Sequence, residues 1–264
     1  MPQADWSARI QRLLAPVGPR IVEALGRTGP LRFKAGREVV TQVDRDVERL
    51  IAERILADFP DHAVIGEEFG RSGAEDAATV WHVDPVDGTL NYALGIPIFS
   101  VSVAVVRDGV TVAGAVLDPL QDELYVAARG EGAWRDDQRL VVSERGTLRE
   151  AIGSLHSSRR GRFVQNAQIL QQLHLSIGKL RRLGSVALEL AYVARGTFDV
   201  LLTSKREAQN LYDVAAGVLL IEEAGGRVTD GCGRPFAEGD GELVASNGRV
   251  HDEVLALIRC DDDA

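Results

Sequence analysis

Residues 81–89 read Trp81-His82-Val83-Asp84-Pro85-Val86-Asp87-Gly88-Thr89. The apolar run Val80–Val83 predicts a short buried strand that ends at Asp84, because the proline that follows holds the residue before it in an extended conformation. Asp87 comes three residues later, and the glycine after it permits a tight turn before a new helix. Carboxylates without histidine or thiolate partners are hard oxygen ligands, which suit Mg²⁺ better than Zn²⁺. The segment therefore predicts a magnesium site at the end of a strand.

The same segment also carries groups that suit a phosphate. The carbonyl of Val86 lies between the two aspartates and could be a further metal ligand. The backbone N–H groups of Gly88 and Thr89 would meet an anion at the N-terminus of a helix. Metal and anion sites would then be adjacent, as metal-assisted hydrolysis of a phosphate ester requires.

Simpler interpretations of this segment stay open at this point. Asp87-Gly88 alone is a common turn, and Thr89 alone could be an ordinary helix N-cap. A calcium loop of the EF-hand type does not fit, because its acidic residues alternate and a glutamate must close the loop. The haloacid dehalogenase-type phosphatases are the sharpest competitor, since their motif also ends in Asp-Gly-Thr. Their aspartates are two residues apart near the chain start, whereas here the spacing is three and more than 80 residues precede the motif.

Hydrophobic patterning predicts a mixed α/β chain with antiparallel pairing in its first half. The 264 residues are 45% hydrophobic and 26% charged, which suffices for a core in one large or two smaller domains. The predicted helices are Trp6–Leu25 with proline kinks, a segment after Thr41, Asn166–Leu173, Ser185–Ala194, Tyr212–Glu223 and Val250–Ile258. A predicted hairpin pairs Ile98–Val106 with Val110–Leu117. Strand-like patterning gives way at Val141–Arg149, which predicts domains 1–145 and 146–264.

Charge and cysteine content limit the partners and the compartment. The formal net charge is −9, which repels nucleic acid and anionic membranes at long range. Cys232 and Cys260 are too few for a disulfide framework and lack Cys-x-x-Cys spacing, so we expect free thiols. Met1–Trp6 shows no signal peptide, and no apolar run reaches the ~20 residues of a membrane span. We therefore expect a cytoplasmic protein that binds neither nucleic acid nor membrane.

Acidic residues gather in five short blocks along the chain. In order, the blocks are Val39-Val40-Thr41-Gln42-Val43-Asp44, Ile65-Gly66-Glu67-Glu68, Asp84-Pro85-Val86-Asp87-Gly88-Thr89, Leu211-Tyr212-Asp213-Val214-Ala215-Ala216-Gly217 and Glu222-Glu223-Ala224-Gly225-Gly226. One block is a weak signal, but five in this order resemble the inositol monophosphatase family over about residues 30–248. The resemblance implies an α/β fold, the layered αβαβα sandwich of the inositol monophosphatase and fructose-1,6-bisphosphatase type.

The resemblance also implies a centre of two or three Mg²⁺ ions. Its ligands would be Glu67, Asp84, the Val86 carbonyl, Asp87 and Asp213. In the family's mechanism a metal-bound water attacks phosphorus directly, without a phospho-enzyme. Carried onto this chain, Glu67 and Thr89 would orient that water, and Asp44 would accept a hydrogen bond from the Thr89 hydroxyl. The Gly88 and Thr89 amides would hold the phosphate oxygens.

Taken one at a time, these acids have simpler explanations. Asp44 and Asp213 could each be a first-turn acid that favours the positive end of a helix dipole. Glu67 and Glu68 could both be surface acids in a loop, and the choice of Glu67 rests on the family pattern. His82 is more simply a core or edge histidine of a strand than a metal ligand.

Residues 182–187, Arg-Leu-Gly-Ser-Val-Ala, resemble the family's substrate segment. The resemblance places Ser185 and Val186 beside the alcohol part of the substrate, together with Asp87. Val186 stands where the family has a small residue, so we expect the wall of the pocket to be shaped differently in this chain.

The stretch between Asp199 and Asp213 is a few residues longer than in typical inositol monophosphatases. Glu207 is therefore only a candidate for the glutamate that contacts inositol in those enzymes. Lys205 and Arg206 are most simply a solvated loop. As a functional hypothesis, they form a second anion subsite that accepts the far phosphate of a bisphosphate.

These features predict a Mg²⁺-dependent phosphomonoesterase for a small polyol or sugar phosphate, with inositol 1-phosphate as the first candidate. Fructose 1,6-bisphosphate and histidinol phosphate stay open as alternatives. A nucleotide phosphatase is disfavoured, because Leu188 and Glu189 occupy the region where those relatives carry a lysine. The non-enzyme alternative is a regulatory or interaction protein that keeps the metal site. A homodimer and inhibition by lithium are expectations from the family.

Overall fold

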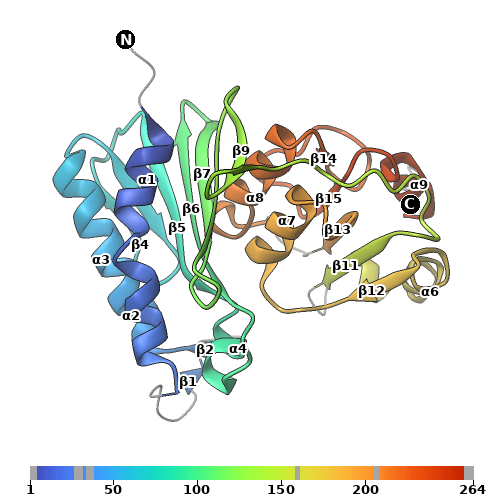
Figure 1. Cartoon of the computed structure of the whole chain (residues 1–264), viewed down its shortest axis with the longest axis horizontal. Coiled ribbons are helices and arrows are strands. Elements are labelled where there is room, and N and C mark those ends of the chain that lie inside the picture. The colour runs from blue at the N-terminus through green and yellow to red at the C-terminus, as the bar shows by residue number, and fades with distance from the viewer. Residues whose placement is uncertain (1–4, 27–31, 34–38, 158–160, 205–208, 259–264) are drawn as a thin grey trace.

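Two β-sheets and three groups of helices form five alternating layers in this protein, in the order α-β-α-β-α (Figure 1). The computed structural model describes residues 5–26, 32–33, 39–157, 161–204 and 209–258. The predicted layered α/β sandwich is confirmed. A separate two-stranded sheet pairs β1 (Arg32–Phe33) with β2 (Val39–Val40).

The large sheet has eight strands in the order β10-β9-β8-β7-β6-β5-β3-β4. They are β3 (Ala63–Gly66), β4 (Gly70–Gly73), β5 (Thr79–Asp87), β6 (Ser100–Arg107), β7 (Val110–Asp118), β8 (Glu123–Ala128), β9 (Gly132–Arg135) and β10 (Gln138–Arg139). All neighbours are antiparallel except β3 and β5, which run parallel. The predicted hairpin is confirmed between β6 and β7. Asp108 and Gly109 both have positive φ there, at 50° and 77°, as a tight two-residue turn requires.

The small sheet has five strands in the order β12-β11-β13-β15-β14. They are β11 (Ile152–Ser157), β12 (Lys179–Arg181), β13 (Val200–Ser204), β14 (Arg227–Thr229) and β15 (Glu242–Ser246). Strand β11 is parallel to both β12 and β13, whereas β15 is antiparallel to β13 and β14. The carboxyl ends of the parallel strands therefore meet at one edge of this sheet.

The first helix layer covers one face of the large sheet with α1 (Trp6–Leu14), α2 (Val17–Ala24) and α3 (Gln42–Asp58). The side chain of Asp5 accepts a hydrogen bond from the Ala8 amide at 3.0 Å and so caps α1. The single helix expected over Trp6–Leu25 is instead two helices, which meet at Ala15 and Pro16. Proline has no N–H for the preceding turn, so the helix breaks there and does not merely kink.

The central layer consists of α7 (Val186–Ala194) and α8 (Leu211–Glu223), which pack between the two sheets. Two glycines permit the close approach of these elements. A Cβ at Gly114 on β7 would lie 2.7 Å from the Ala216 Cα of α8, and a Cβ at Gly217 would lie 2.4 Å from the Leu190 Cβ of α7. Both distances are shorter than real side chains permit, so these positions need glycine.

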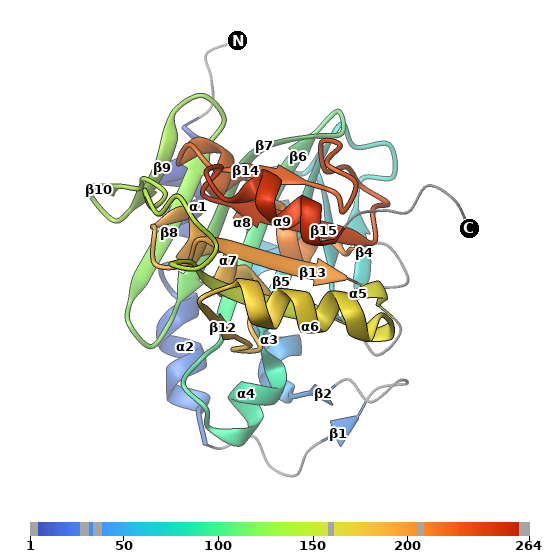
Figure 2. The ribbon, with the colours of Figure 1, turned by 90° about the vertical axis from the view of Figure 1, so that its right-hand side faces the viewer.

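The last layer, α5 (Arg162–Gln165), α6 (Ala167–Ser176) and α9 (His251–Leu257), covers the outer side of the small sheet (Figure 2). Alternate residues of β13 face the two helix layers, as a pleated strand requires. Leu201 joins the core with α7 and α8, whereas Val200 and Leu202 join the core beneath α6 and α9. A short helix, α4 (Thr89–Leu94), connects β5 to the rest of the large sheet.

The chain passes from the large sheet to the small one along residues 140–151, which include the predicted boundary at Val141–Arg149. Helix α8 nevertheless shares one core with both sheets. The division into domains 1–145 and 146–264 therefore stays a prediction.

The state of the cysteines differs from the expectation. Cys232 is disulfide-bonded, so the expectation of free thiols is wrong; its partner lies outside the described residues. Because disulfides persist mainly in oxidising compartments, this finding removes one argument for a cytoplasmic location. Among the helices that the structure describes, none has the length and apolar character to cross a bilayer.

Candidate functional site

Strand β5 carries two buried aspartates near its end. The exposed fractions of Asp84 and Asp87 are 2% and 8%. The pairing of β5 with β6 shifts register between them, where Pro85 has no N–H to donate to a neighbouring strand. Asp84 accepts a hydrogen bond from the Val86 amide at 3.0 Å. The local turn therefore fixes the orientation of the Asp84 carboxylate.

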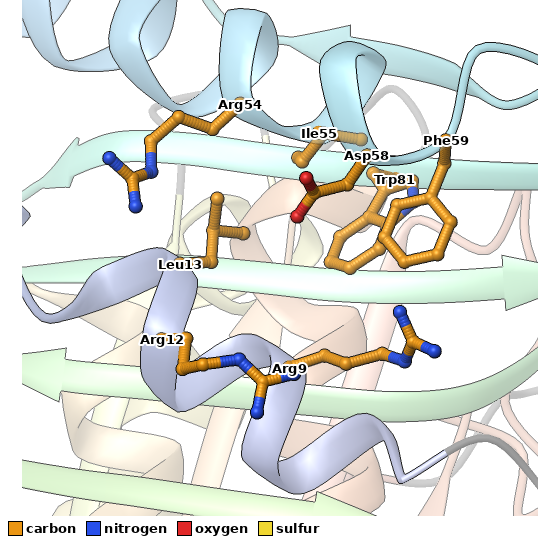
Figure 3. A pocket seen from close by; sticks show the side chains of 8 residues that line it. All are labelled: Arg9, Arg12, Leu13, Arg54, Ile55, Asp58, Phe59 and Trp81. Carbon is orange, nitrogen blue, oxygen red and sulfur yellow. The ribbon is translucent and has the colours of Figure 1, made fainter.

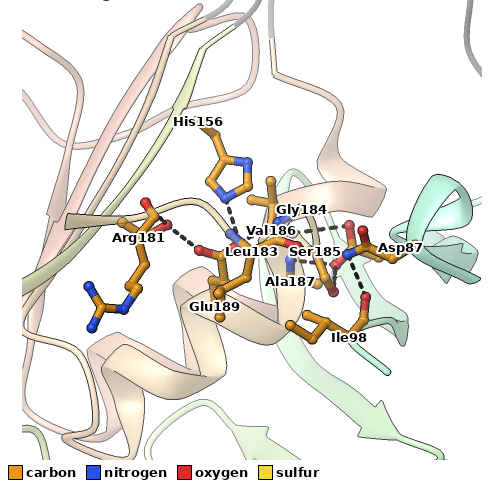
Figure 4. A network of polar contacts seen from close by, with 12 residues as sticks. Asp87, Ile98, His156, Arg181, Leu183, Gly184, Ser185, Val186, Ala187 and Glu189 are labelled. Atoms are coloured by element: carbon orange, nitrogen blue, oxygen red, sulfur yellow. Dashed lines mark hydrogen bonds and ion pairs between the residues drawn. The ribbon is translucent and has the colours of Figure 1, made fainter. Parts of the chain in front are cut away.

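Asp87 contacts the beginning of α7, which lies 98 to 100 residues later in the sequence. Its carboxylate accepts hydrogen bonds from the Ser185 hydroxyl at 2.5 Å, the Val186 amide at 3.1 Å and the Ala187 amide at 2.8 Å (Figure 4). The Ser100 hydroxyl on β6 donates a fourth at 3.2 Å. Asp87 thus caps α7 from another part of the chain, and it joins the large sheet to the central helix layer.

Glu67 and Asp213 approach the two aspartates from other elements. Glu67 follows the last residue of β3, and its amide donates to the Val83 carbonyl of β5 at 3.2 Å. Asp213 lies in the first turn of α8 and is half-buried. The charges of Glu67, Asp87 and Asp213 therefore all reach Asp84, and the charge of Asp213 also reaches Asp87.

Burial and neighbouring negative charge raise the pKa of both buried aspartates. Burial raises the pKa of Asp84 well above its ordinary value. The charges of Asp87, Glu67 and Asp213 raise that pKa further. Burial likewise raises the pKa of Asp87 to about 6, with a contribution from Asp213, while its hydrogen bonds from the start of α7 oppose the rise. A bound dication would offset this repulsion.

The donor chemistry of these residues fits Mg²⁺, because the predicted ligands are carboxylate and carbonyl oxygens. Within the described residues, however, no three histidine, cysteine, aspartate or glutamate side chains stand together as a ready-made metal cluster. The Asp87 carboxylate is held by the start of α7. The charges of three of the acids act on Asp84, but the carboxylates do not yet form a coordination sphere. A bound ion would have to bring their oxygens closer together.

Thr89 and Asp44 do not form the hydrogen bond that was expected between them. The Thr89 hydroxyl donates to the Val86 carbonyl at 3.0 Å. Asp44 Oδ2 accepts from the Thr41 hydroxyl and from the Thr41 amide, the latter at 2.9 Å, in a capping box at the start of α3. Asp44 Oδ1 is buried with no hydrogen-bond partner in the described part of the chain, and burial raises the pKa of Asp44. The expected contact is therefore wrong, because the Thr89 hydroxyl donates its hydrogen bond to the Val86 carbonyl instead.

The turn after Asp87 is tightly enclosed. Gly88 has φ +92°, in the left-handed region that favours glycine, and it precedes the first residue of α4. A Cβ on Gly88 would lie 3.1 Å from the Gly184 carbonyl oxygen and 3.3 Å from the Ser185 Cβ. The predicted phosphate loop and the predicted substrate segment are therefore in direct contact.

The substrate segment has a more specific role in the structure than the one expected. Ser185 is fully buried, and its hydroxyl donates to Asp87, while Val186 is half-buried. The substrate contacts of Ser185 and Val186 stay predictions. Lys205, Arg206 and Glu207 lie outside the described residues, so their proposed roles stay predictions as well.

Glu48 on α3 is a residue of the site that the sequence analysis did not single out. It is 2% exposed, and its carboxylate accepts hydrogen bonds from the amides of Glu68 at 2.7 Å and Phe69 at 2.9 Å. These amides directly follow Glu67, so Glu48 holds the loop on which Glu67 stands. The available signal was an acid beside Val47 within an apolar helical stripe.

Glu189 on α7 is the second such residue, and the sequence analysis considered it only as a replacement for a lysine. It is fully buried and accepts hydrogen bonds from the amides of Leu183 and Gly184 (Figure 4). The available signal was again an acid within an otherwise apolar helix.

Two cavities of the described surface lie apart from the four acids. One, of about 190 Å³, lies between α1 and α3 over Trp81 (Figure 3). It is lined by Arg9, Arg12, Leu13, Arg54, Ile55, Asp58, Phe59 and Trp81. The other, of about 250 Å³, is bordered by the β6–β7 hairpin, α8 and residues 236–238. Neither is lined by any of the predicted metal ligands.

Comparison with known proteins identifies the family and agrees with the fold. The sequence profile of the inositol monophosphatase family matches residues 12–262. A fructose-1,6-bisphosphatase/inositol-1-monophosphatase of Thermotoga maritima is 34% identical over 260 residues, which cover 98% of this chain and 96% of that protein. An inositol-1-monophosphatase of Rhizobium meliloti is 40% identical over 231 residues, which cover 86% of this chain and 85% of that protein.

A solved structure supports the same grouping. The extragenic suppressor protein SuhB from Bartonella henselae superposes with a TM-score of 0.88 at 30% identity, and the match covers 96% of this chain and 99% of that one.

Proposed function

The chain belongs to the inositol monophosphatase family and is a phosphoric monoester hydrolase, and we propose that it hydrolyses a small polyol or sugar phosphate, above all inositol 1-phosphate, with Mg²⁺ as its cofactor. The observation that supports the cofactor most is the burial of Asp84 and Asp87, which are 2% and 8% exposed, within reach of further negative charge from Asp213. Acids at such mutual range inside a protein are costly unless a cation accompanies them.

Five oxygen donors would hold the ions. They are the carboxylates of Glu67, Asp84, Asp87 and Asp213 and the carbonyl of Val86. When bound, Mg²⁺ would supply a water of lowered pKa and would neutralise charge on the phosphate. A chain with a net charge of −9 needs such an ion to attract an anionic substrate.

The chain's own groups would orient the substrate and the attacking water. The Thr89 hydroxyl is fixed by the Val86 carbonyl, and with Glu67 it would orient the water. The Gly88 and Thr89 amides would hold phosphate oxygens, because the first N–H groups of a helix have no partner within it. Asp44, whose Oδ1 has no hydrogen-bond partner among the residues that the structure describes, would act from behind this loop. Domain 1–145 would then contribute four of these donors, and domain 146–264 would contribute Asp213.

The choice of alcohol is a separate part of the proposal. Ser185, Val186 and Asp87 would line the alcohol side of the site, and Glu207 would contact a hydroxyl. Fructose 1,6-bisphosphate and histidinol phosphate are the alternative substrates. Lys205→Ala and Arg206→Ala should lower kcat/KM for fructose 1,6-bisphosphate more than for inositol 1-phosphate; an equal loss on both would sink the second anion subsite.

Phosphate release tests the proposed function directly. Inositol 1-phosphate, fructose 1,6-bisphosphate and histidinol phosphate are each incubated with the protein, with and without millimolar Mg²⁺. We expect Mg²⁺-dependent release, with a loss of kcat/KM on the order of 10²-fold or more in Asp84→Asn and Asp213→Asn. Asp76→Asn, which changes an exposed acid on the large-sheet side, is the matched control.

A failure of this test has a clear meaning. If no phosphate is released from any substrate with Mg²⁺ present, the proposed activity is wrong. The alternative hypothesis, a regulatory or interaction protein that keeps the metal site, would then be favoured. A homodimer, a cytoplasmic location and loss of activity at millimolar Li⁺ are further parts of the proposal, and size-exclusion chromatography, cell fractionation and a Li⁺ titration test them.

A further inference from the structure

Glu189 is a fully buried carboxylate at the junction of three segments of the chain. Its Oε1 accepts hydrogen bonds from the Leu183 amide at 3.2 Å and the Gly184 amide at 3.0 Å, and it lies 2.5 Å from His156 Nε2 (Figure 4). Its Oε2 accepts from the Ser154 hydroxyl. A carboxylate without exposure is tolerated only when donors replace its water, and here four donors do so.

The donors to Glu189 come from two elements besides its own helix. Ser154 and His156 lie on β11, whose carboxyl end meets this edge of the small sheet. Leu183 and Gly184 form the turn before α7. Glu189 therefore ties this turn both to its own helix and to the small sheet.

The turn that Glu189 holds has little freedom to move without effects on its neighbours. Gly184 has φ +91°, and the Asn91 side chain donates to the carbonyl of Leu183 at 2.7 Å from the other side. The Gly184 carbonyl in turn packs against Gly88. A shift of the turn by a few tenths of an ångström would therefore also displace the loop after Asp87.

The residues that follow this turn hold Asp87. Ser185, Val186 and Ala187 are consecutive in sequence with Gly184, and they supply three of the four hydrogen bonds to the Asp87 carboxylate. Because α7 begins directly after this turn, the position of the turn determines the direction in which these donors point. Glu189 can therefore orient Asp87 through the turn, without touching it.

We propose that Glu189 is a positioning residue, which fixes the Leu183–Gly184 turn so that the start of α7 presents its hydroxyl and two amides to Asp87. The role rests on hydrogen-bond acceptance and not on negative charge as such. A glutamine can keep Oε1 as the acceptor for the two amides, and its nitrogen can donate to the Ser154 hydroxyl, which itself can donate to the Arg181 carbonyl. Alanine and aspartate cannot reach the turn.

Amide hydrogen exchange of the metal-free protein tests the proposal without any reference to catalysis. We compare the wild type with Glu189→Gln, Glu189→Asp and Glu189→Ala, with Glu53→Ala on the exposed side of α3 as control. The amides of Val186 and Ala187 should lose about 10- to 100-fold of their protection in the alanine and aspartate variants, and only a few-fold in the glutamine variant. Unchanged protection in Glu189→Asp and Glu189→Ala would overturn the proposal. If the alanine variant does not fold, the aspartate variant alone decides.

The Mg²⁺ titration gives a second readout, and this one rests on the proposed function. We expect Glu189→Asp to raise the Mg²⁺ concentration for half-maximal activity by about 10- to 100-fold, and Glu189→Gln to restore it to within a few-fold of the wild type. A glutamine variant as impaired as the aspartate variant in both readouts would overturn the acceptor role. An inactive wild type would overturn the proposed function only, because the exchange measurement would still decide the role of Glu189.

Discussion

Asp84 and Asp87 are both buried and lie three residues apart, yet their surroundings differ in the number of donors. The described hydrogen bonds to Asp84 come from one backbone amide, whereas Asp87 has two amides and two hydroxyls. Burial raises the pKa of both groups, and because donors favour the charged form, the hydrogen bonds from Ser185 and Ala187 oppose the rise at Asp87, as the one from Val86 does at Asp84. At the residue scale, Asp84 is therefore a buried acid with one described donor, which a bound cation would stabilise, and Asp87 is the one held in place by the fold.

His251 carries a prediction at the same scale, away from the site. It is fully buried at the start of α9, where its ring nitrogens contact Thr229 Oγ1 at 2.9 Å and Ser246 Oγ at 2.8 Å. Burial lowers the pKa of His251 to about 4, and the Arg227 charge adds to this while Asp252 opposes it. The Thr229 hydroxyl donates to a carbonyl, so it accepts from the histidine Nε2–H, and the neutral ring satisfies both contacts.

The sign of the pH effect follows from linkage. Between pH 4 and 6.5 the unfolded chain binds a proton at His251 that the folded chain does not, so the free energy of unfolding should fall as the pH falls through this window. His251→Gln should remove a slope of up to about 1.4 kcal/mol per pH unit from urea-unfolding data collected across it. His174→Gln, at an exposed position, should leave the slope unchanged. An unaltered slope in His251→Gln would show that another group titrates.

At the scale of elements, the contact between α7 and α8 determines how closely the central layer can pack. Gly217 on α8 lies against Leu190 on α7, and alanine there would place its Cβ 2.4 Å from the Leu190 Cβ. Overpacking of this kind costs about 1–3 kcal/mol, whereas the gain in helix propensity from glycine to alanine is at most ~1 kcal/mol. The steric term should therefore prevail.

Gly217→Ala should lower the free energy of unfolding by about 1–2 kcal/mol, measured by urea denaturation. Gly146→Ala is the control, because a Cβ there meets nothing within 4 Å and the residue does not have a positive φ. That control should stay within about 0.5 kcal/mol of the wild type. A Gly217→Ala variant as stable as the control would mean that α7 and α8 can move apart freely.

At the scale of the whole molecule, the four acids of the proposed metal centre come from both halves of the chain. Three stand on or beside the large sheet, and Asp213 stands on α8, whose core also includes the small sheet. An ion bound by all four would therefore connect parts that separate on unfolding. Binding to the folded state alone stabilises it by mass action.

Mg²⁺ should accordingly raise the melting temperature. At a Mg²⁺ concentration 100-fold above its Kd, the free energy of unfolding should rise by about 2.7 kcal/mol. This corresponds to an increase in Tm of roughly 5–10 °C for a chain of this size. A chelator should reverse the shift, and Asp213→Asn should reduce it while Asp76→Asn keeps it, as followed by differential scanning calorimetry. An equal shift in Asp213→Asn would argue that this residue is not a ligand.

Local patterns of sequence were sufficient for much of this protein. Turn residues and hydrophobic periodicity predicted the β6–β7 hairpin and most helices, because those features depend on residues within a few positions of one another. The order of the acidic blocks predicted the family, and the family implied the five layers. Two local features were nevertheless missed. At Pro16 a kink was predicted where the helix breaks, and for Asp44 a distant partner was predicted where the residue forms a capping box with Thr41.

The sequence by itself thus determined most of the elements and the family, since both depend on residue identity and short spacing. Only the tertiary structure decided that Asp87 caps α7, that Glu48 and Glu189 hold the loops behind the site, and that Cys232 is oxidised. The physical reason is distance along the chain. Donors up to 100 residues away compete for the same carboxylate, and only packing of the two sheets around the central helices determines which of them reach it.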